Sequence, residues 1–465
     1  MKYPRLMLAA ASSGSGKTTI TCGLLQCLKN RGIKTAAFKC GPDYIDPMFH
    51  ETVLQTPSAN LDTFFTDEKM TRYLFSEHAK KAELSVIEGV MGYYDGLAGI
   101  STEASAYDLA KKTETPVVLI INGQGMSLSI AAMIQGFLNF RTPSQVCGVI
   151  LNRISPMMYP LMKEQIEREC HVQVLGYVPK LEEGTLQSRH LGLVLPSEIP
   201  ELSMQLEKLA EILERSIDID GLIRLAESAP EMDAEMPEGL QKLLQSERTA
   251  AIRAAKPKIA VARDEAFCFI YKDNLKLLKE LGAEITEFSP IHDRELPKDC
   301  DGLLLYGGYP ELYAKELSEN SSMLESVRER VSAGLPLLAE CGGFMYLHDS
   351  MEDLEKKEYP MAGVIHGSVY YTGKLKRFGY ITLSAEGQKT LRGHEFHYFD
   401  STACGEDYLA KKPLRERSWR CIHRTETMTA GFPHLYYYAE PEMLLEYLEL
   451  CCRQKLSGKS EEREG

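Results

Sequence analysis

Two segments of this chain combine residue types at spacings that could do chemistry. Residues 11–18 read ASSGSGKT, and residues 336–343 read PLLAECGG. The first combines glycines, a lysine and a hydroxyl in the manner of a loop that binds phosphate. The second sets Cys341 between an apolar run and a glycine pair, a context for a nucleophilic thiol. Together they predict a nucleotide-driven reaction that is supplied with a fragment cut from a second substrate by a thiol.

The phosphate loop lies between an apolar run at residues 6–11 and a helical periodicity at 18–30. This order predicts a strand, a tight loop and a helix N-terminus, which together direct backbone N–H groups and the helix dipole at a phosphate. Ala11 stands where the usual pattern has its first glycine, which indicates a divergent branch of P-loop proteins. Lys17 is expected to reach the terminal phosphates. The predicted nucleotide-binding residues of the loop are Ser13, Gly14, Ser15, Gly16, Lys17 and Thr18.

Carboxylates follow two of the predicted strands. Glu88 ends the apolar run 84–88, which predicts a Walker-B-like position where a carboxylate and the Thr18 hydroxyl could hold Mg²⁺. Asp43 and Asp46 lie in a Pro/Gly-bracketed loop after residues 35–38, and Asp95 follows Glu88 in a second glycine-rich loop. These aspartates are candidate metal or substrate ligands. The alternative that they only form turns stays open.

Composition limits the remaining alternatives. The chain has 465 residues, enough for two or three domains, and its net charge of −13 lacks the basic footprint of a nucleic-acid-binding protein. We found neither a run long enough to span a membrane nor a signal cleavage site, so we expect a cytoplasmic protein without nucleic-acid or membrane partners. The 12 cysteines are expected to be reduced thiols, mostly buried.

The spacing of apolar runs predicts two successive α/β domains. Near-continuous apolar segments at 116–121, 145–151 and 174–179 are typical of parallel strands covered on both faces. Asn152, which ends the second of these, is a candidate for recognising the nucleotide base. We predict a doubly wound, mainly parallel P-loop domain at 1–220, a linker at 221–255, a second α/β domain at 256–452 and a disordered tail at 453–465.

The second domain contains the candidate thiol chemistry. Gly307 and Gly308 follow the apolar strand 303–306, and backbone N–H groups at such a turn could form an oxyanion hole. Cys341 lies between a strand and a helix, where a thiolate is stabilised. His434 is the best candidate for its base. His394 and His397 are interpreted as structural rather than as a metal pair, because no third ligand accompanies them at a zinc-site spacing.

Over nearly its whole length the chain resembles the cobyrinic acid a,c-diamide synthases, which join a dethiobiotin synthetase-like domain to a class I-like glutamine amidotransferase domain. The residues that carry the resemblance are Ser12 to Thr18, Gly41 to Tyr44, Glu88 to Gly92, Arg189 to Leu193, Gly307 to Glu311, Glu340 to Gly343 and His394 to His397.

The resemblance implies that Cys341 forms a glutamyl thioester and releases ammonia, with His434 as base and Gly308 and Gly342 at the oxyanion. In class I enzymes a glutamate stands two residues after the histidine, but here that residue is Tyr436. This departure makes the base assignment less secure than the nucleophile.

For the first domain, the resemblance implies that ATP and Mg²⁺ convert a substrate carboxylate into an acyl phosphate that ammonia attacks. Thr18, Glu88 and Asp46 are the expected metal ligands. The residues expected at the substrate are Asp43, Tyr44, Asp95, Arg189 and His190.

A polycarboxylated tetrapyrrole calls for a locally basic cleft in this acidic chain, and Arg153, Arg189 and His190 are hypothetical contributors. The a and c side chains of cobyrinic acid are the leading substrate. Hydrogenobyrinic acid and nickel sirohydrochlorin remain alternatives, as does a nucleotide-dependent regulator with an inert glutaminase-like domain. A homodimer is a possible assembly that the sequence leaves open.

Overall fold

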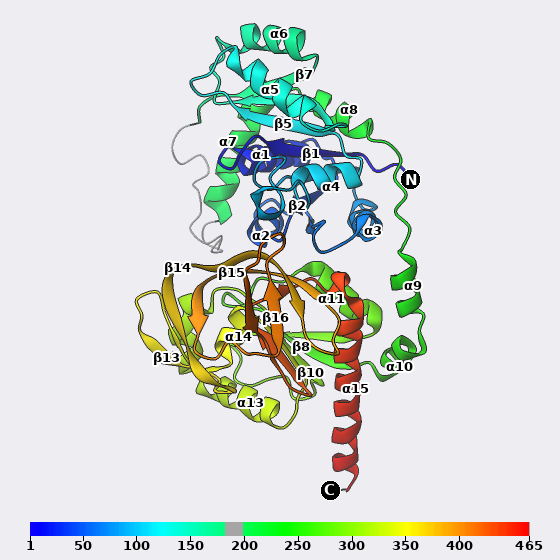
Figure 1. Ribbon diagram of the computed structural model, residues 1–465, viewed down its shortest axis with the longest axis vertical. Coiled ribbons are helices and arrows are strands. Elements are labelled where there is room, and N and C mark those ends of the chain that lie inside the picture. The colour runs from blue at the N-terminus through cyan, green and yellow to red at the C-terminus, as the bar shows by residue number, and fades with distance from the viewer. Residues whose placement is uncertain (182–198, 465) are drawn as a thin grey trace. The chain divides into compact units, whose positions relative to one another are not determined.

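The computed structural model describes residues 1–181 and 199–464, and the chain divides into two compact units, Met1–Pro237 and Glu238–Gly465 (Figure 1). Each unit has its own α/β core, so the predicted fold class is confirmed. Among the described residues no helix is long and apolar enough to cross a membrane.

The first unit is built on a seven-stranded sheet in the order β3-β2-β4-β1-β5-β6-β7, in which every pairing is parallel. Its strands are almost wholly buried apolar runs, as expected for a sheet covered by helices on both faces. The strands are β1 (Arg5–Ala10), β2 (Thr35–Cys40), β3 (Ser58–Leu61), β4 (Leu84–Glu88), β5 (Val117–Asn122), β6 (Val146–Asn152) and β7 (Gln173–Val178).

Helices alternate with most of the strands of the first unit along the chain, as in a doubly wound fold, and a short 3₁₀ turn, η1 (Leu97–Gly99), follows β4. Helix α7 packs against α1, and both contribute to one apolar core with β1, β4 and β5. The helices are α1 (Lys17–Asn30), α2 (Ile45–Thr52), α3 (Glu68–Ala79), α4 (Ala106–Lys112), α5 (Ser129–Asn139), α6 (Tyr159–Cys170), α7 (Ile199–Ser216) and α8 (Ile219–Glu227).

The segment expected as a linker at 221–255 is largely folded. Helix α8 buries Ile219, Leu222 and Ala226 in the first core, and the chain after it returns to the N-terminus. There the buried guanidinium of Arg5 donates to the carbonyl oxygens of Pro230 at 3.0 Å and Thr113 at 3.0 Å. Because these bonds hold the chain to β1 beyond α8, the first unit ends at Pro237 rather than near residue 220.

The second unit contains two sheets. The first has the order β18-β19-β11-β10-β8-β9 and is parallel except for β18. Its strands are β8 (Lys258–Ala262), β9 (Glu284–Phe288), β10 (Gly302–Leu305), β11 (Leu337–Glu340), β18 (His423–Arg424) and β19 (Met428–Gly431). The second sheet is mixed, with the order β13-β12-β14-β15-β20; β16 also pairs with β14, and β17 pairs with β16. Its strands are β12 (His348–Glu352), β13 (Glu358–Pro360), β14 (Ile365–Ser384), β15 (Leu391–Ser401), β16 (Tyr408–Lys411), β17 (Ser418–Cys421) and β20 (His434–Leu435).

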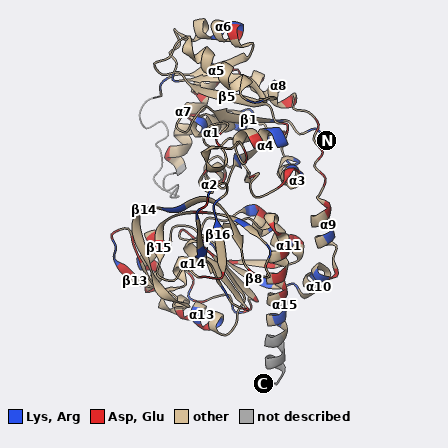
Figure 2. Ribbon diagram, in the orientation of Figure 1, with Lys and Arg blue, Asp and Glu red and all other residues tan. Residues whose placement is uncertain are grey.

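The second unit also contains the helices α9 (Glu238–Leu244), α10 (Glu247–Ala255), α11 (Lys272–Leu281), α12 (Ala314–Glu319), α13 (Ser321–Ser332), α14 (Gly342–Tyr346) and α15 (Pro441–Glu464), with the 3₁₀ turns η3 (Pro310–Tyr313) and η4 (Tyr437–Ala439). Helix α15 therefore includes most of the segment expected as a disordered tail. Charged residues of both signs lie along α10 and α15 (Figure 2), and Arg248 of α10 bonds Glu449 at 2.7 Å and Glu442 at 3.0 Å. These ion pairs fix α10 as part of the second unit.

Candidate active sites

The candidate nucleotide site lies at the carboxyl edge of the first sheet. Because all seven strands are parallel, the residues that end or follow them meet at one edge, where ligands of open α/β sheets bind. The register sets Lys39 of β2 beside Glu88 of β4, and Leu8 of β1 on the other side of Glu88. The loop between β1 and α1 therefore lies next to the carboxylate that ends β4.

The loop at 11–18 is held in shape by a side chain from β6. The amide of Asn152 donates to the carbonyl oxygen of Ser15 at 2.8 Å, and Gly16 has a φ of +95°. A Cβ on Gly16 would stand 2.3 Å from the Asn152 nitrogen, so only glycine fits. Asn152 thus acts on the loop backbone in this structure, and its recognition of a nucleotide base stays a prediction.

Lys17 points back across the loop. Its Nζ lies 2.5 Å from the carbonyl oxygen of Met91 and 3.5 Å from that of Ser12. Burial and the neighbouring Lys39 lower the pKa of Lys17. A phosphate in the loop would offer this ammonium a better partner than two carbonyl oxygens.

The three predicted metal ligands come together around Lys39. The Thr18 hydroxyl donates to Glu88 Oε1 at 2.6 Å, the Lys39 ammonium donates to the same oxygen at 2.8 Å, and Lys39 also pairs with Asp46. Burial disfavours a charged lysine, but the carboxylates of Glu88 and Asp46 outweigh it and raise the pKa of Lys39. Burial raises the pKa of Glu88 to about 7. Lys39 is thus a site residue that the sequence interpretation did not select; its place at the end of a strand beside the Pro/Gly loop was the available signal.

The expected substrate residues divide into three groups. Asp43 accepts from the backbone N–H of Ile45 at 2.7 Å and so begins α2, which is the turn-forming role left open above. Tyr44 is buried at the start of the same helix. Asp95 accepts from the N–H of Gly92 at 2.9 Å and holds the loop after β4 beside Ala11. Arg189 and His190 lie outside the described residues.

The candidate thiol of the second unit has the backbone of a nucleophile elbow. Cys341 follows β11 and precedes α14, with φ +46° and ψ −105°, a conformation that is strained for any residue with a side chain. The Cys341 N–H donates to the Gly431 carbonyl at 2.9 Å, and the Cys341 carbonyl accepts from the N–H of Met345 at 2.9 Å. The surrounding strands and helix therefore impose the conformation, and strain of this kind is concentrated at functional sites.

Gly307 lies between the thiol residue and the predicted base. A Cβ on Gly307 would stand 2.4 Å from His434 Cε1, 3.3 Å from His434 Nδ1 and 3.4 Å from Cys341 Cβ. Glycine at this position therefore lets the imidazole of His434 in β20 approach Cys341, which follows β11. The structure brings together the two residues that the sequence predicted, although 93 positions separate them along the chain.

The two glycines predicted at the oxyanion also meet at this turn. The Cβ position of Gly342 lies 3.2 Å from the backbone nitrogen of Gly308. Gly308, after β10, and Gly342, at the start of α14, thus lie close together next to Cys341, and an oxyanion hole formed by their N–H groups stays a prediction.

Burial keeps both members of the pair uncharged at rest. It raises the pKa of the Cys341 thiol far above its usual range, and the carboxyl groups of Glu311 and Glu395 act in the same direction. Burial also lowers the pKa of His434 to about 3. A neutral thiol next to a neutral imidazole is a nucleophile with a general base, in which the proton moves only when a substrate is attacked.

The two histidines of β15 surround this site. The ring of His394 stacks on His434 at 4.9 Å, and His397 bonds Glu395 at 2.8 Å. Within residues 1–181 and 199–464 no three His, Cys, Asp or Glu side chains form a metal site. His394 and His397 contact their neighbours by ring stacking and hydrogen bonding.

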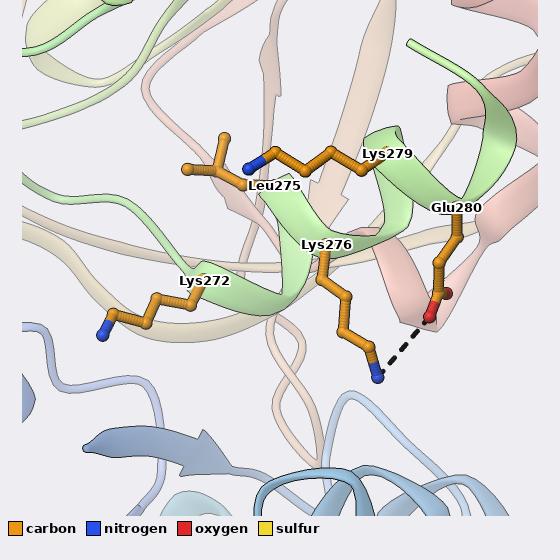
Figure 3. Close-up of a pocket in the computed structure, with 5 residues that line it drawn as sticks. All are labelled: Lys272, Leu275, Lys276, Lys279 and Glu280. Atoms are coloured by element: carbon orange, nitrogen blue, oxygen red, sulfur yellow. Dashed lines mark ion pairs between the residues drawn. The ribbon is translucent and has the colours of Figure 1, made fainter. Parts of the chain in front are cut away.

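A separate surface hollow of about 510 Å³ lies on α11. It is lined by Leu275, three lysines and Glu280, and Lys276 forms an ion pair with Glu280 at 3.5 Å (Figure 3). Its lining contains none of the predicted site residues. The opposite side of α11 serves the thiol site, since the Asn274 amide donates to the Leu435 carbonyl at 3.0 Å.

Comparison with known proteins finds a family model within each unit. Residues 6–193 match the CobQ/CobB/MinD/ParA nucleotide binding domain, and residues 258–433 match the CobB/CobQ-like glutamine amidotransferase domain. A solved glutamine amidotransferase aligns with 41% of this chain and 98% of its own at 21% identity and a TM-score of 0.31. The two family matches, a nucleotide binding domain joined to a glutamine amidotransferase domain, define the class as a glutamine-dependent amidating ligase.

Full-length relatives narrow the class. The cobyrinate a,c-diamide synthase of Caldanaerobacter subterraneus subsp. tengcongensis is 39% identical over 96% of this chain and 98% of its own length. That of Listeria innocua serovar 6a is 39% identical over 95% and 98%. The chain belongs to the cobyrinate a,c-diamide synthase family.

Proposed function

We propose that the protein amidates the a and c side-chain carboxylates of cobyrinic acid with nitrogen from glutamine, in two ATP-dependent steps that pass through acyl phosphates. The observation that carries the proposal is the strained Cys341 backbone beside His434, in a chain that also holds a P-loop. The names of the relatives support this tetrapyrrole as substrate and cobalamin biosynthesis as the pathway.

In the second unit, His434 removes the thiol proton as sulfur attacks the amide carbon of glutamine. Backbone N–H groups of Gly308 and Gly342 stabilise the oxyanion, and the imidazolium returns the proton to the leaving nitrogen. The carbon–nitrogen bond breaks, ammonia leaves, and water hydrolyses the thioester to glutamate. The buried site favours neutral ammonia, the form that attacks, over ammonium.

In the first unit, the loop N–H groups and Lys17 hold the phosphates of ATP. Lys39 is placed to offset negative charge as the γ-phosphoryl group passes to a substrate carboxylate. That transfer turns a carboxylate, which ammonia does not attack, into an acyl phosphate with a good leaving group.

The residues present fit a Mg²⁺ ion. Glu88 Oε2 is buried and has no hydrogen-bond partner among the described residues. Thr18 donates to the other oxygen of Glu88, and Asp46 shares the Lys39 ammonium with Glu88. Mg²⁺ is commonly held by one or two carboxylates and by substrate phosphates. Thr18, Glu88 and Asp46 would hold the ion, which when bound neutralises the charge that develops on the transferring phosphate.

The test offers cobyrinic acid, its metal-free counterpart and nickel sirohydrochlorin together with MgATP and glutamine, without oxygen, and reads the products by mass spectrometry. We expect double amidation of cobyrinic acid. Cys341→Ala should abolish the reaction with glutamine and retain it with ammonium. Amidation of a different ring would refute the substrate, and amidation by Cys341→Ala with glutamine would refute the thiol mechanism.

A further inference from the structure

Class I enzymes place a carboxylate two residues after their catalytic histidine, where it orients the imidazole. Tyr436 occupies that position, and its hydroxyl donates to Asp273 Oδ2 of α11 at 2.7 Å. Both residues are buried, so this bond ties Tyr436 to α11. A catalytic imidazole acts together with a group that fixes its tautomer and stabilises its charged form.

Glu340 is placed to supply that group from the other side. It is the last residue of β11 and directly precedes Cys341, and it is 4% exposed. Its Oε2 lies 3.9 Å from His434 Nδ1, while its Oε1 accepts from the Tyr437 hydroxyl at 3.2 Å. Oε2 has no hydrogen-bond partner among the described residues. One oxygen is thus anchored and the other is directed at the imidazole.

We propose that Glu340 is the positioning residue for His434: its carboxylate accepts the Nδ1 proton, directs Nε2 toward the Cys341 thiol and balances the imidazolium formed when the thiol reacts. This inference rests on the proposed glutaminase function. The S–H bond breaks as sulfur bonds to the glutamine carbon, and the proton goes first to Nε2 and then to the departing ammonia. Glu340 neither gains nor loses a proton in the cycle.

The physical reason is the cost of a buried cation. His434 is 1% exposed, and an imidazolium there has no water to solvate it. A carboxylate within about 4 Å is the partner that makes proton transfer from the thiol feasible. The polar groups that face Glu340 include His434 and the backbone N–H of Leu435 in β20, Tyr437 of η4 and Tyr306 after β10.

The ionisation of Glu340 should therefore appear in the pH profile. Burial raises the pKa of Glu340 to about 8, and hydrogen bonds from the Leu435 backbone N–H and from the Tyr437 hydroxyl oppose this shift. A carboxyl group with a raised pKa is protonated below that pKa and loses its charge as the pH falls. Glutaminase activity should therefore decline on the acid side, and removal of the Tyr437 hydroxyl should move this decline to higher pH.

The experiment measures glutamine hydrolysis and the rate at which azaserine, a glutamine analogue, labels Cys341 in the full-length protein between pH 6 and 9. The variants are Glu340→Gln, Tyr437→Phe and, as a matched control, Tyr436→Phe. We expect Glu340→Gln to lower kcat for glutamine at least ~10-fold, by analogy with loss of the third member of a triad. The KM for glutamine and the ammonium-dependent rate should stay within about 3-fold, and the acid decline should disappear.

Tyr437→Phe should shift the acid decline upward in pH, whereas Tyr436→Phe should leave it in place. A purely structural role for Glu340 would lower both nitrogen-donor activities together and leave the shape of the profile unchanged, which overturns the inference. Equal labelling of the wild type and Glu340→Gln would also overturn it. Absence of labelling in the wild type would instead refute the proposed glutaminase function itself.

Discussion

Replacing Gly307 by alanine should separate the two activities of the protein. The added Cβ would stand 2.4 Å from His434 Cε1, whereas ordinary contacts begin at 3.4 Å. The imidazole must therefore move by about 1 Å, and a displacement of that size typically costs ~100-fold in rate. We expect kcat for glutamine to fall by about two orders of magnitude. The ammonium-dependent reaction does not use His434 and should be retained.

The assay is amide formation with glutamine and with ammonium, followed in parallel, together with the melting temperature of each variant. Gly239→Ala is the matched control, because a Cβ there meets nothing within 4 Å and the residue lies in helix α9. It should leave both activities unchanged. If Gly307→Ala keeps the wild-type rate with glutamine, the imidazole is not held against this turn and His434 is not the base.

Three further predictions concern the buried ionisable side chains of Lys39, Arg5 and His348. Lys39→Met should lower ATP-dependent amidation at least ~100-fold with either nitrogen donor, because two buried carboxylates lose their counter-ion. Azaserine should still label Cys341 at the wild-type rate. A loss of activity with glutamine alone would contradict the role of Lys39. Arg5→Met should reduce the free energy of unfolding of the first unit by roughly 3 kcal/mol because it strands buried carbonyl groups, and a loss under about 1 kcal/mol would contradict that bonding. Burial lowers the pKa of His348 to about 4 from 6.5. A histidine kept neutral in the fold makes its full contribution to stability above pH 6.5 and loses it as the pH falls toward 4. His348→Gln should therefore reduce the drop in melting temperature between pH 7 and pH 5, and an unchanged drop would contradict this account.

The parts of the site that could be predicted from sequence are those with local chemistry. The P-loop, the strand ending in Glu88 and the Cys341 turn are each specified by residues within about ten positions. His434 was selected because it lies at the end of a short late segment, and the structure sets it beside Gly307. The fold class could be predicted because near-continuous apolar runs are typical of strands in a sheet that is covered on both faces.

Contacts between distant segments could not be predicted in this way. Lys39 lies near the end of the buried strand β2, and its role depends on a register that pairs it with Glu88. Glu340 reads as part of the thiol motif, and its approach to His434 depends on how β11 and β20 meet in three dimensions. The end of the first unit was placed too early because the bond between Arg5 and Pro230 joins residues 225 positions apart.

The most direct test of the account traces nitrogen from glutamine into the tetrapyrrole. The wild-type protein would be given cobyrinic acid, MgATP and glutamine whose amide carries heavy nitrogen, and the product would be analysed by mass spectrometry together with the ADP formed. The account predicts a diamide with heavy nitrogen in both amides and one ADP for each, and no labelled product from Cys341→Ala. Unlabelled amides, or labelled amides from Cys341→Ala, would contradict it.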